Sequence, residues 1–279
     1  MYEIPLQIQS AIRKYQPVTV DGLTLYPIQV KNRNAFFTAS PAISFMQQTL
    51  PVSLMRVPLL SAYWQMEMQD AVSGEEGMGL FYRALLFLAL AFRLGEGQSD
   101  IERVRKFEII VDPDKPEQLK ALRFMVNGME QTEITPAQFQ RLRPVLAAQN
   151  GIHMETEDAN PELVEAERDS AESNSVKLDA DPDAQISFVA ALSHTEECEI
   201  EEWPILKLKR RENTYTHLIH YFLCGVAEAE GRSWKCGNPY PHPYYERTKT
   251  ISGGLRDIKD VLSGEAQKAI DNPGEKVSQ

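Results

Sequence analysis

Hydrophobic and polar positions near the N-terminus follow the spacing of β-strands. Two β-prone runs at residues 17–20 and 23–27 flank Asp21-Gly22. This residue pair readily adopts the positive φ angles of a tight turn, so the segment is predicted to be a β-hairpin. Two further β-prone runs and a third beyond Asn127-Gly128 predict a small sheet later in the chain, with strands at 106–111, 122–126 and 130–134.

Between the hairpin and the sheet, apolar side chains recur at helical spacing. The spacing predicts helices over residues 31–40, 44–50 and 58–69. In the first of these, Phe36 and Phe37 are both expected to face the core. The most apolar stretch, 79–94, predicts a buried helix that ends at Gly95.

The second half of the chain is predicted to be helical. Thr135-Pro136 is a typical helix start, and the helix is expected to end near Gln149. Further helices are predicted at 183–192 and after Thr195, which is expected to cap a short helix. A long helix is predicted from about 204 to 230, with one apolar face formed by Ile205, Leu208, Tyr215, Leu218, Ile219, Phe222, Leu223 and Val226.

These patterns predict an α+β fold that is predominantly helical, with small antiparallel sheet elements in the N-terminal half and a helical C-terminal part. The chain has a net charge of 29 − 40 = −11. Residues 153–183 contain eleven acidic and two basic side chains, which gives −9, so the acidity is local. The composition predicts an N-terminal α+β domain at 1–152 and an acidic linker with a short helix at 153–183. The remaining residues, 184–279, are predicted to form a helical region with a strap rich in proline and tyrosine.

Composition and charge exclude several classes of function. The acidic balance argues against nucleic acid and anionic membranes as partners. The apolar stretch at 78–94 carries Arg83 and Arg93 and is shorter than the roughly 20 apolar residues of a membrane span. The N-terminus has no signal-peptide pattern. Three widely spaced cysteines indicate reduced thiols in a cytoplasm.

One cluster has the residue types of a metal site. His217, His220 and Cys224 fall at i, i+3 and i+7 of the long helix, and Cys236 and His242 follow. Imidazole and thiolate ligands suit tetrahedral zinc, but the spacing matches no known zinc module, and His and Cys are also common core residues. The same cluster could supply a nucleophilic Cys–His pair, but the sequence shows no Asn or Asp at a spacing that would orient the histidine. With no phosphate-binding glycine loop either, the sequence predicts a protein that is not an enzyme and needs no cofactor.

Two segments are candidates for contact with a protein partner. The first is the start of the long helix, with Trp203, Lys207, Arg210 and Arg211. The second is the strap with Tyr240, Tyr244 and Tyr245, in which three prolines hold aromatic rings in an extended strip. The alternatives are an ordinary charged helix face for the first segment and a strap packed on the helical core for the second.

Several short blocks resemble proteins encoded by tailed phages and phage-tail-like gene clusters of Gram-positive bacteria. These blocks are Leu25–Lys31 followed by an aromatic pair, Ile134–Phe139 through Gly151, Asn160–Glu167, Glu201–Pro204 and Gly237–Pro241. None of them contains a catalytic signature, so the resemblance implies no site residues.

The resemblance implies a role in tail assembly in the host cytoplasm, through protein–protein contacts and possible homo-oligomers. Such a protein acts as a chaperone for the tail tube or tape measure. One alternative is a structural component of the baseplate or tail that remains in the particle. Another is a protein stabilised by zinc, or dependent on a metal, at the His217 and Cys224 cluster.

Overall fold

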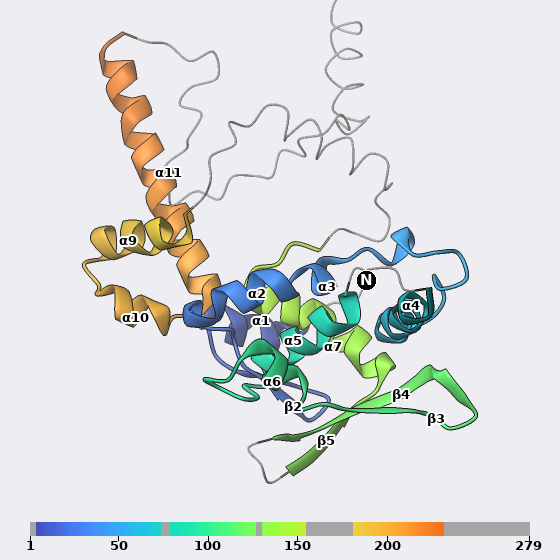
Figure 1. Cartoon of the computed structure of the whole chain (residues 1–279). Helices are drawn as coiled ribbons and strands as arrows, with labels where there is room; N and C mark the ends of the chain where they lie inside the picture. The colour runs from blue at the N-terminus through green and yellow to red at the C-terminus, as the bar shows by residue number, and fades with distance from the viewer. Residues whose placement is uncertain (1–3, 74–78, 127–129, 155–180, 232–279) are drawn as a thin grey trace, which may run out of the picture. The chain divides into compact units, whose positions relative to one another are not determined.

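A computed structural model of the chain describes residues 4–73, 79–126, 130–154 and 181–231 (Figure 1). The fold is α+β and predominantly helical, with one two-stranded and one three-stranded antiparallel sheet, as the sequence predicts. The chain divides into two compact units. Of the described residues, those up to Tyr215 belong to the first unit and those from Thr216 onward to the second.

In the N-terminal half, the elements that precede α4 (Leu59–Ser73) are all short. In chain order, the elements are α1 (Leu6–Arg13), β1 (Val18–Val20), β2 (Leu23–Leu25), the 3-10 turn η1 (Val30–Asn32), α2 (Arg33–Ala39), α3 (Pro41–Ser44), the 3-10 turn η2 (Gln47–Thr49), α4, α5 (Leu80–Ala91) and α6 (Asp100–Val104). Then follow β3 (Glu108–Asp112), β4 (Lys115–Val126), β5 (Glu130–Ile134), α7 (Pro136–Asn150), α9 (Pro182–Ser193), α10 (Glu197–Glu201) and α11 (Ile205–Ala229).

The predicted hairpin is confirmed. Strands β1 and β2 pair Val18 with Leu25 and Val20 with Leu23, and Asp21 and Gly22 both have positive φ, as the turn requires. Alternate residues of the hairpin are buried, so its inner face joins the core.

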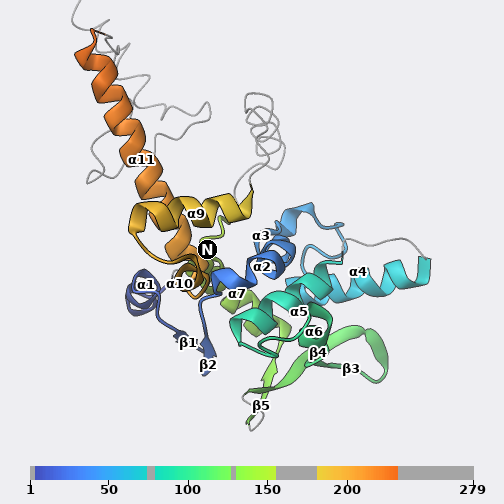
Figure 2. The same cartoon turned by 60° about the vertical axis from the view of Figure 1, so that its left-hand side comes forward.

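Helix α5 is the centre of the first unit. Ten of its twelve residues are buried, and it contacts α2, α3, α4 and α6. A helix that is apolar on nearly all sides needs cover on nearly all sides, and these neighbours supply it (Figures 1 and 2). The buried core helix that the sequence predicts here is confirmed, although α5 ends at Ala91, before the predicted end.

The three-stranded sheet has β4 in the middle, with antiparallel β3 and β5 on either side. It packs against α4, and the ring of Phe124 lies 4.9 Å from Phe92 and 5.2 Å from Phe107. The predicted small sheet is therefore confirmed, with β4 longer than expected. The turn predicted at Asn127-Gly128 lies outside the described residues.

Helix α7 begins with the capping group that its sequence predicts. The Thr135 hydroxyl accepts from the Gln138 main-chain N–H, and the Gln138 side chain accepts from the Thr135 N–H. The helix also places three polar side chains inside the core. Arg143 donates to the Ile43 and Phe45 carbonyls. Gln149 donates to the carbonyl of Leu25 at the end of β2, and Asn150 accepts from the Ile28 N–H just after β2.

The start of α11 is attached to the segment after β2 by main-chain hydrogen bonds. The Val30 N–H donates to the Trp203 carbonyl, and the Ile205 N–H donates to the Ile28 carbonyl, each over 2.9 Å. Elements α9, α10 and the start of α11 therefore belong to the unit of the N-terminal elements. The domain boundary that the acidic composition predicts at 153–183 falls almost wholly outside the described residues and stays a prediction. The predicted short helix of that linker and the proline-tyrosine strap lie outside the described residues.

Several local predictions need correction. Residues 44–50 do not form a helix: Ser44 ends α3, and the turn η2 covers Gln47–Thr49. Phe36 is buried, whereas Phe37 is 49% exposed, because neighbouring helix positions point about 100° apart. Glu196, and not Thr195, is the N-cap of α10. The sequence reading also missed α1 and α6, although Ser99 and Glu102 form a complete capping box at the start of α6.

Candidate interaction surfaces and a polar pocket

The predicted metal ligands lie on the last turns of α11. His217, His220 and Cys224 share one side of this helix, and Cys236 is outside the described residues. His217 and Cys224 lie about two turns apart, or about 10 Å along the helix axis. Within the described part of the chain, no three His, Cys, Asp or Glu side chains are grouped to hold a metal. The four-residue site with Cys236 stays a prediction.

The basic run at the start of α11 contacts aromatic rings of its own unit. Lys207 Nζ lies 3.6 Å from the centre of the Trp203 ring, Lys209 Nζ 5.3 Å from Phe36, and the Arg210 guanidinium 5.4 Å from Tyr15. Burial lowers the pKa of Lys207, and the nearby positive charge of Arg211 lowers it further. Burial also lowers the pKa of Lys209, against the opposing charge of Glu212.

These contacts give the basic run a role within the fold. Two of its four cations, Lys209 and Arg210, help to hold α11 on the N-terminal elements, whereas Lys207 packs on the neighbouring Trp203 and Arg211 is exposed. The partner-binding role predicted for Trp203, Lys207, Arg210 and Arg211 stays a prediction. Tyr240, Tyr244 and Tyr245 lie outside the described residues.

The apolar face of α11 changes character along the helix. Ile205, Leu206 and Leu208 are buried in the first unit. Farther on, Ile219, Phe222, Leu223 and Val226 are 39%, 60%, 61% and 57% exposed. At 100° per residue these four side chains fall within an arc of about 100°, so they form one continuous stripe, here called the α11 stripe.

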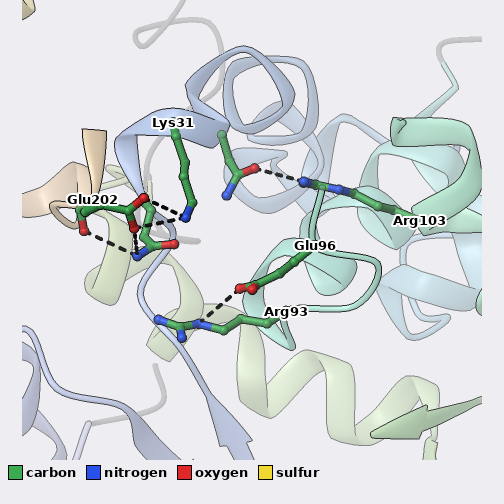
Figure 3. A network of polar contacts seen from close by, with 7 residues as sticks. Lys31, Arg93, Glu96, Arg103 and Glu202 are labelled. Carbon is green, nitrogen blue, oxygen red and sulfur yellow. Dashed lines mark hydrogen bonds and ion pairs between the residues drawn. The ribbon is translucent and has the colours of Figure 1, made fainter. Parts of the chain in front are cut away.

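A polar pocket lies in the first unit, where η1, the end of α5 and the start of α6 meet. Figure 3 shows its charged residues. Lys31 Nζ donates to both carboxylate oxygens of Glu202, at 2.8 and 2.9 Å, and Arg93 Nε lies 3.8 Å from Glu96. Arg103, only 7% exposed, donates from Nη2 to the Asn32 side-chain oxygen over 2.9 Å.

The pocket has two adjoining parts. The outer part is an open hollow of about 390 Å³ lined by Lys31, Asn32, Glu96, Gly97, Gln98 and Arg103. The inner part, of about 10 Å³, is lined by residues that include Ile28, Leu90, Arg93 and Leu94, and it shares Asn32, Glu96 and Arg103 with the outer part.

Sequence reasoning found none of these pocket residues. Four separate segments contribute them, and no local pattern connects Lys31 with Arg103. The one available signal was the S-x-x-E pattern at Ser99–Glu102, which would have placed Arg103 in a short helix but not in a pocket.

Comparison with known proteins gives no identification. No family model, curated protein or solved structure matches the chain. Of the helices in the described ranges, none is long and apolar enough to cross a membrane.

Proposed function

We propose that this chain is a phage tail assembly or morphogenesis protein that works through protein–protein contacts. It binds an apolar helical segment of the tail tube or tape-measure protein in the host cytoplasm and keeps that segment from aggregating. The resemblance of the short sequence blocks supports the connection with tails. The α11 stripe is the observation that carries the binding role.

The stripe has the spacing of a helix that docks against an apolar partner. Ile219, Phe222, Leu223 and Val226 stand at i, i+3, i+4 and i+7, which is the anchor pattern of helix-in-groove recognition. Fully burying one such side chain stabilises by about 1.5–3 kcal/mol, so covering the exposed half contributes about 1 kcal/mol each. The four together supply about 4 kcal/mol, or nearly three orders of magnitude in affinity.

Co-expression with each candidate partner tests the proposal. The chain is produced together with the tail tube protein or the tape-measure protein of the same gene cluster, and the soluble yield and co-purification of the partner are measured. The double variant Phe222→Asp/Leu223→Asp is expected to lose the complex, because it places two charges in the docked face.

A matched control separates loss of the stripe from a general effect of charge. Asn213→Asp adds a negative charge at an exposed position of the same helix, well away from the stripe, and is expected to leave the complex intact. Equal partner yield with the stripe variant and the wild type would contradict the proposal. A stripe variant that loses only self-association, measured by light scattering, would assign the stripe to a second copy of this chain.

The main alternative is a structural component of the baseplate or tail. Quantitative mass spectrometry of mature particles distinguishes the two roles. An assembly chaperone is expected to be absent from purified particles, whereas a structural component is present in a fixed ratio to the tube protein. Metal analysis of the purified chain addresses the zinc alternative, which requires stoichiometric zinc and a loss of stability with chelator.

A further inference from the structure

Arg103 carries a buried charge without a counter-ion among the residues that the structure describes. In the described part of the chain, the one hydrogen-bonded partner of its guanidinium is the neutral amide of Asn32, and its buried Nε has no hydrogen-bond acceptor there. No carboxylate in the described ranges lies within 4.0 Å of its guanidinium. A buried charge is costly unless an opposite charge and hydrogen bonds compensate for it, so this arrangement favours an anion beside Arg103.

The other charged groups of the pocket compensate one another. Lys31 is paired with Glu202, and Arg93 lies beside Glu96 and also over the Tyr26 ring at 4.6 Å. Arg103 is therefore the one cation lining the pocket that lacks an ion-pair partner among the described residues. Glu96 lines both parts of the pocket, and its carboxylate repels further negative charge. The pocket therefore favours a ligand group with a single negative charge.

We propose that this pocket binds a single carboxylate group on Arg103. The planar guanidinium offers parallel N–H donors that match the two oxygens of a carboxylate. A phosphate dianion would bring a second negative charge close to Glu96. The outer hollow of about 390 Å³ lies within the usual size of ligand pockets, about 300–1,000 Å³, so the carboxylate can belong to a larger molecule.

A water molecule is the neutral competitor for the same donor. The inner part of the pocket is about 10 Å³, close to the volume that one water needs. Water is a neutral acceptor and would leave the charge of the guanidinium uncompensated. A carboxylate compensates the charge and is expected to displace it.

The Nε–Hε resonance of Arg103 in the ¹⁵N-labelled full chain reports directly on the site. Three carboxylates serve as probes: acetate for a free small acid, N-acetylglycine for a chain terminus, and N-acetylglutamate α-amide for an acidic side chain. At least one is expected to shift the resonance with a Kd on the order of 1 mM. The relative affinities identify the natural source of the carboxylate, and inorganic phosphate is expected to bind more weakly than the best probe.

Three variants make the test specific. Arg103→Lys keeps the charge but removes the planar fork and should weaken binding at least about tenfold. For this variant and for Arg105→Gln, binding is followed by main-chain amide shifts around the pocket. Arg105→Gln removes a charge from an exposed position two residues away and should leave binding unchanged. Glu96→Gln removes the neighbouring carboxylate and should tighten binding up to about fivefold, the largest usual effect of an exposed charge pair.

Three results would overturn the proposal. One is a resonance that no carboxylate moves in either the wild type or Glu96→Gln. Another is phosphate binding as tightly as the best carboxylate. The third is a shift of the Arg103 resonance caused by Glu96→Gln alone, without a later response to carboxylates, because Glu96 would then itself be the partner of Arg103.

Discussion

Asn150, the last residue of α7, connects three distant parts of the first unit. Its side chain is fully buried, accepts from the Ile28 N–H over 2.9 Å, and donates to the Leu146 carbonyl over 2.9 Å. The Ile28 carbonyl in turn accepts from the Ile205 N–H. Asn150→Ala therefore disturbs the segment on which the start of α11 is held.

The loss of folding free energy in Asn150→Ala follows from the Ile28 N–H, which is left buried without an acceptor. Ile28 is 2% exposed, so its N–H would lose its acceptor without gaining water, at a cost of about 1–3 kcal/mol. The better helix propensity of alanine offsets about 0.5 kcal/mol of this. The net loss is expected to be about 1.5 kcal/mol, or a fall in Tm of about 3–6 °C for a unit of this size.

Urea unfolding followed by circular dichroism measures the loss, and amide hydrogen exchange locates it. The Ile28 amide should exchange much faster in Asn150→Ala than in the wild type. Asn34→Ala removes the same atoms at an exposed position of α2 and should change stability by less than about 0.5 kcal/mol. An equally small change for Asn150→Ala, with Ile28 still protected, would refute the reasoning.

Two further variants test contacts in the core. Gly151→Ala should cost about 1–3 kcal/mol in a urea melt, because Gly151 has a φ of 65° and a Cβ there would lie 3.0 Å from Leu206. Gly22 also has a positive φ, but a Cβ there would meet no atom within 4 Å, so Gly22→Ala should lose only the stability that backbone strain costs. An equal loss of stability in both variants would contradict the close contact between residue 151 and Leu206. Tyr63→Phe should cost about 1 kcal/mol at pH 7, because the Tyr63 hydroxyl donates to the Ala42 carbonyl over 2.8 Å. Burial raises the Tyr63 pKa above its usual value of 10.0, against the opposing charge of Arg143, so the wild type loses stability above pH 10 as the unfolded chain ionises. The wild-type advantage should therefore shrink above pH 10, and a constant difference in melts at pH 7 and pH 11 would contradict the role of burial.

The parts of the fold that could be predicted depend on short-range rules. Asp21-Gly22 fixed the hairpin and Thr135-Pro136 fixed the start of α7, because turn geometry and capping involve only neighbouring residues. Thr195 was misassigned for a related reason. A hydroxyl near a helix start can bind elsewhere, and here Thr195 donates to the Ser193 carbonyl.

Burial and the pocket depend on contacts that the sequence does not display. The periodic apolar face of α11 predicted its helix correctly, but periodicity cannot tell that Leu208 is covered while Phe222 is not. The pocket needs Asn32 and Arg103 to meet across 71 positions, which only the packing of α6 beside η1 achieves. No local pattern carries that information.

The attachment of α11 to the segment after β2 has a consequence for the ribosome-bound chain. The hydrogen-bond acceptor of the Val30 N–H is the carbonyl of Trp203, which is translated 173 positions later. At about 5–20 residues per second, translation takes roughly 9–35 s to cover that distance. During this interval residues 203–205, which pair with the η1 segment through main-chain hydrogen bonds, are missing, and Leu206 is not yet present to cover the end of α7. We therefore expect nascent chains shorter than about 210 residues to be more open to proteases and to chaperone binding than the finished protein.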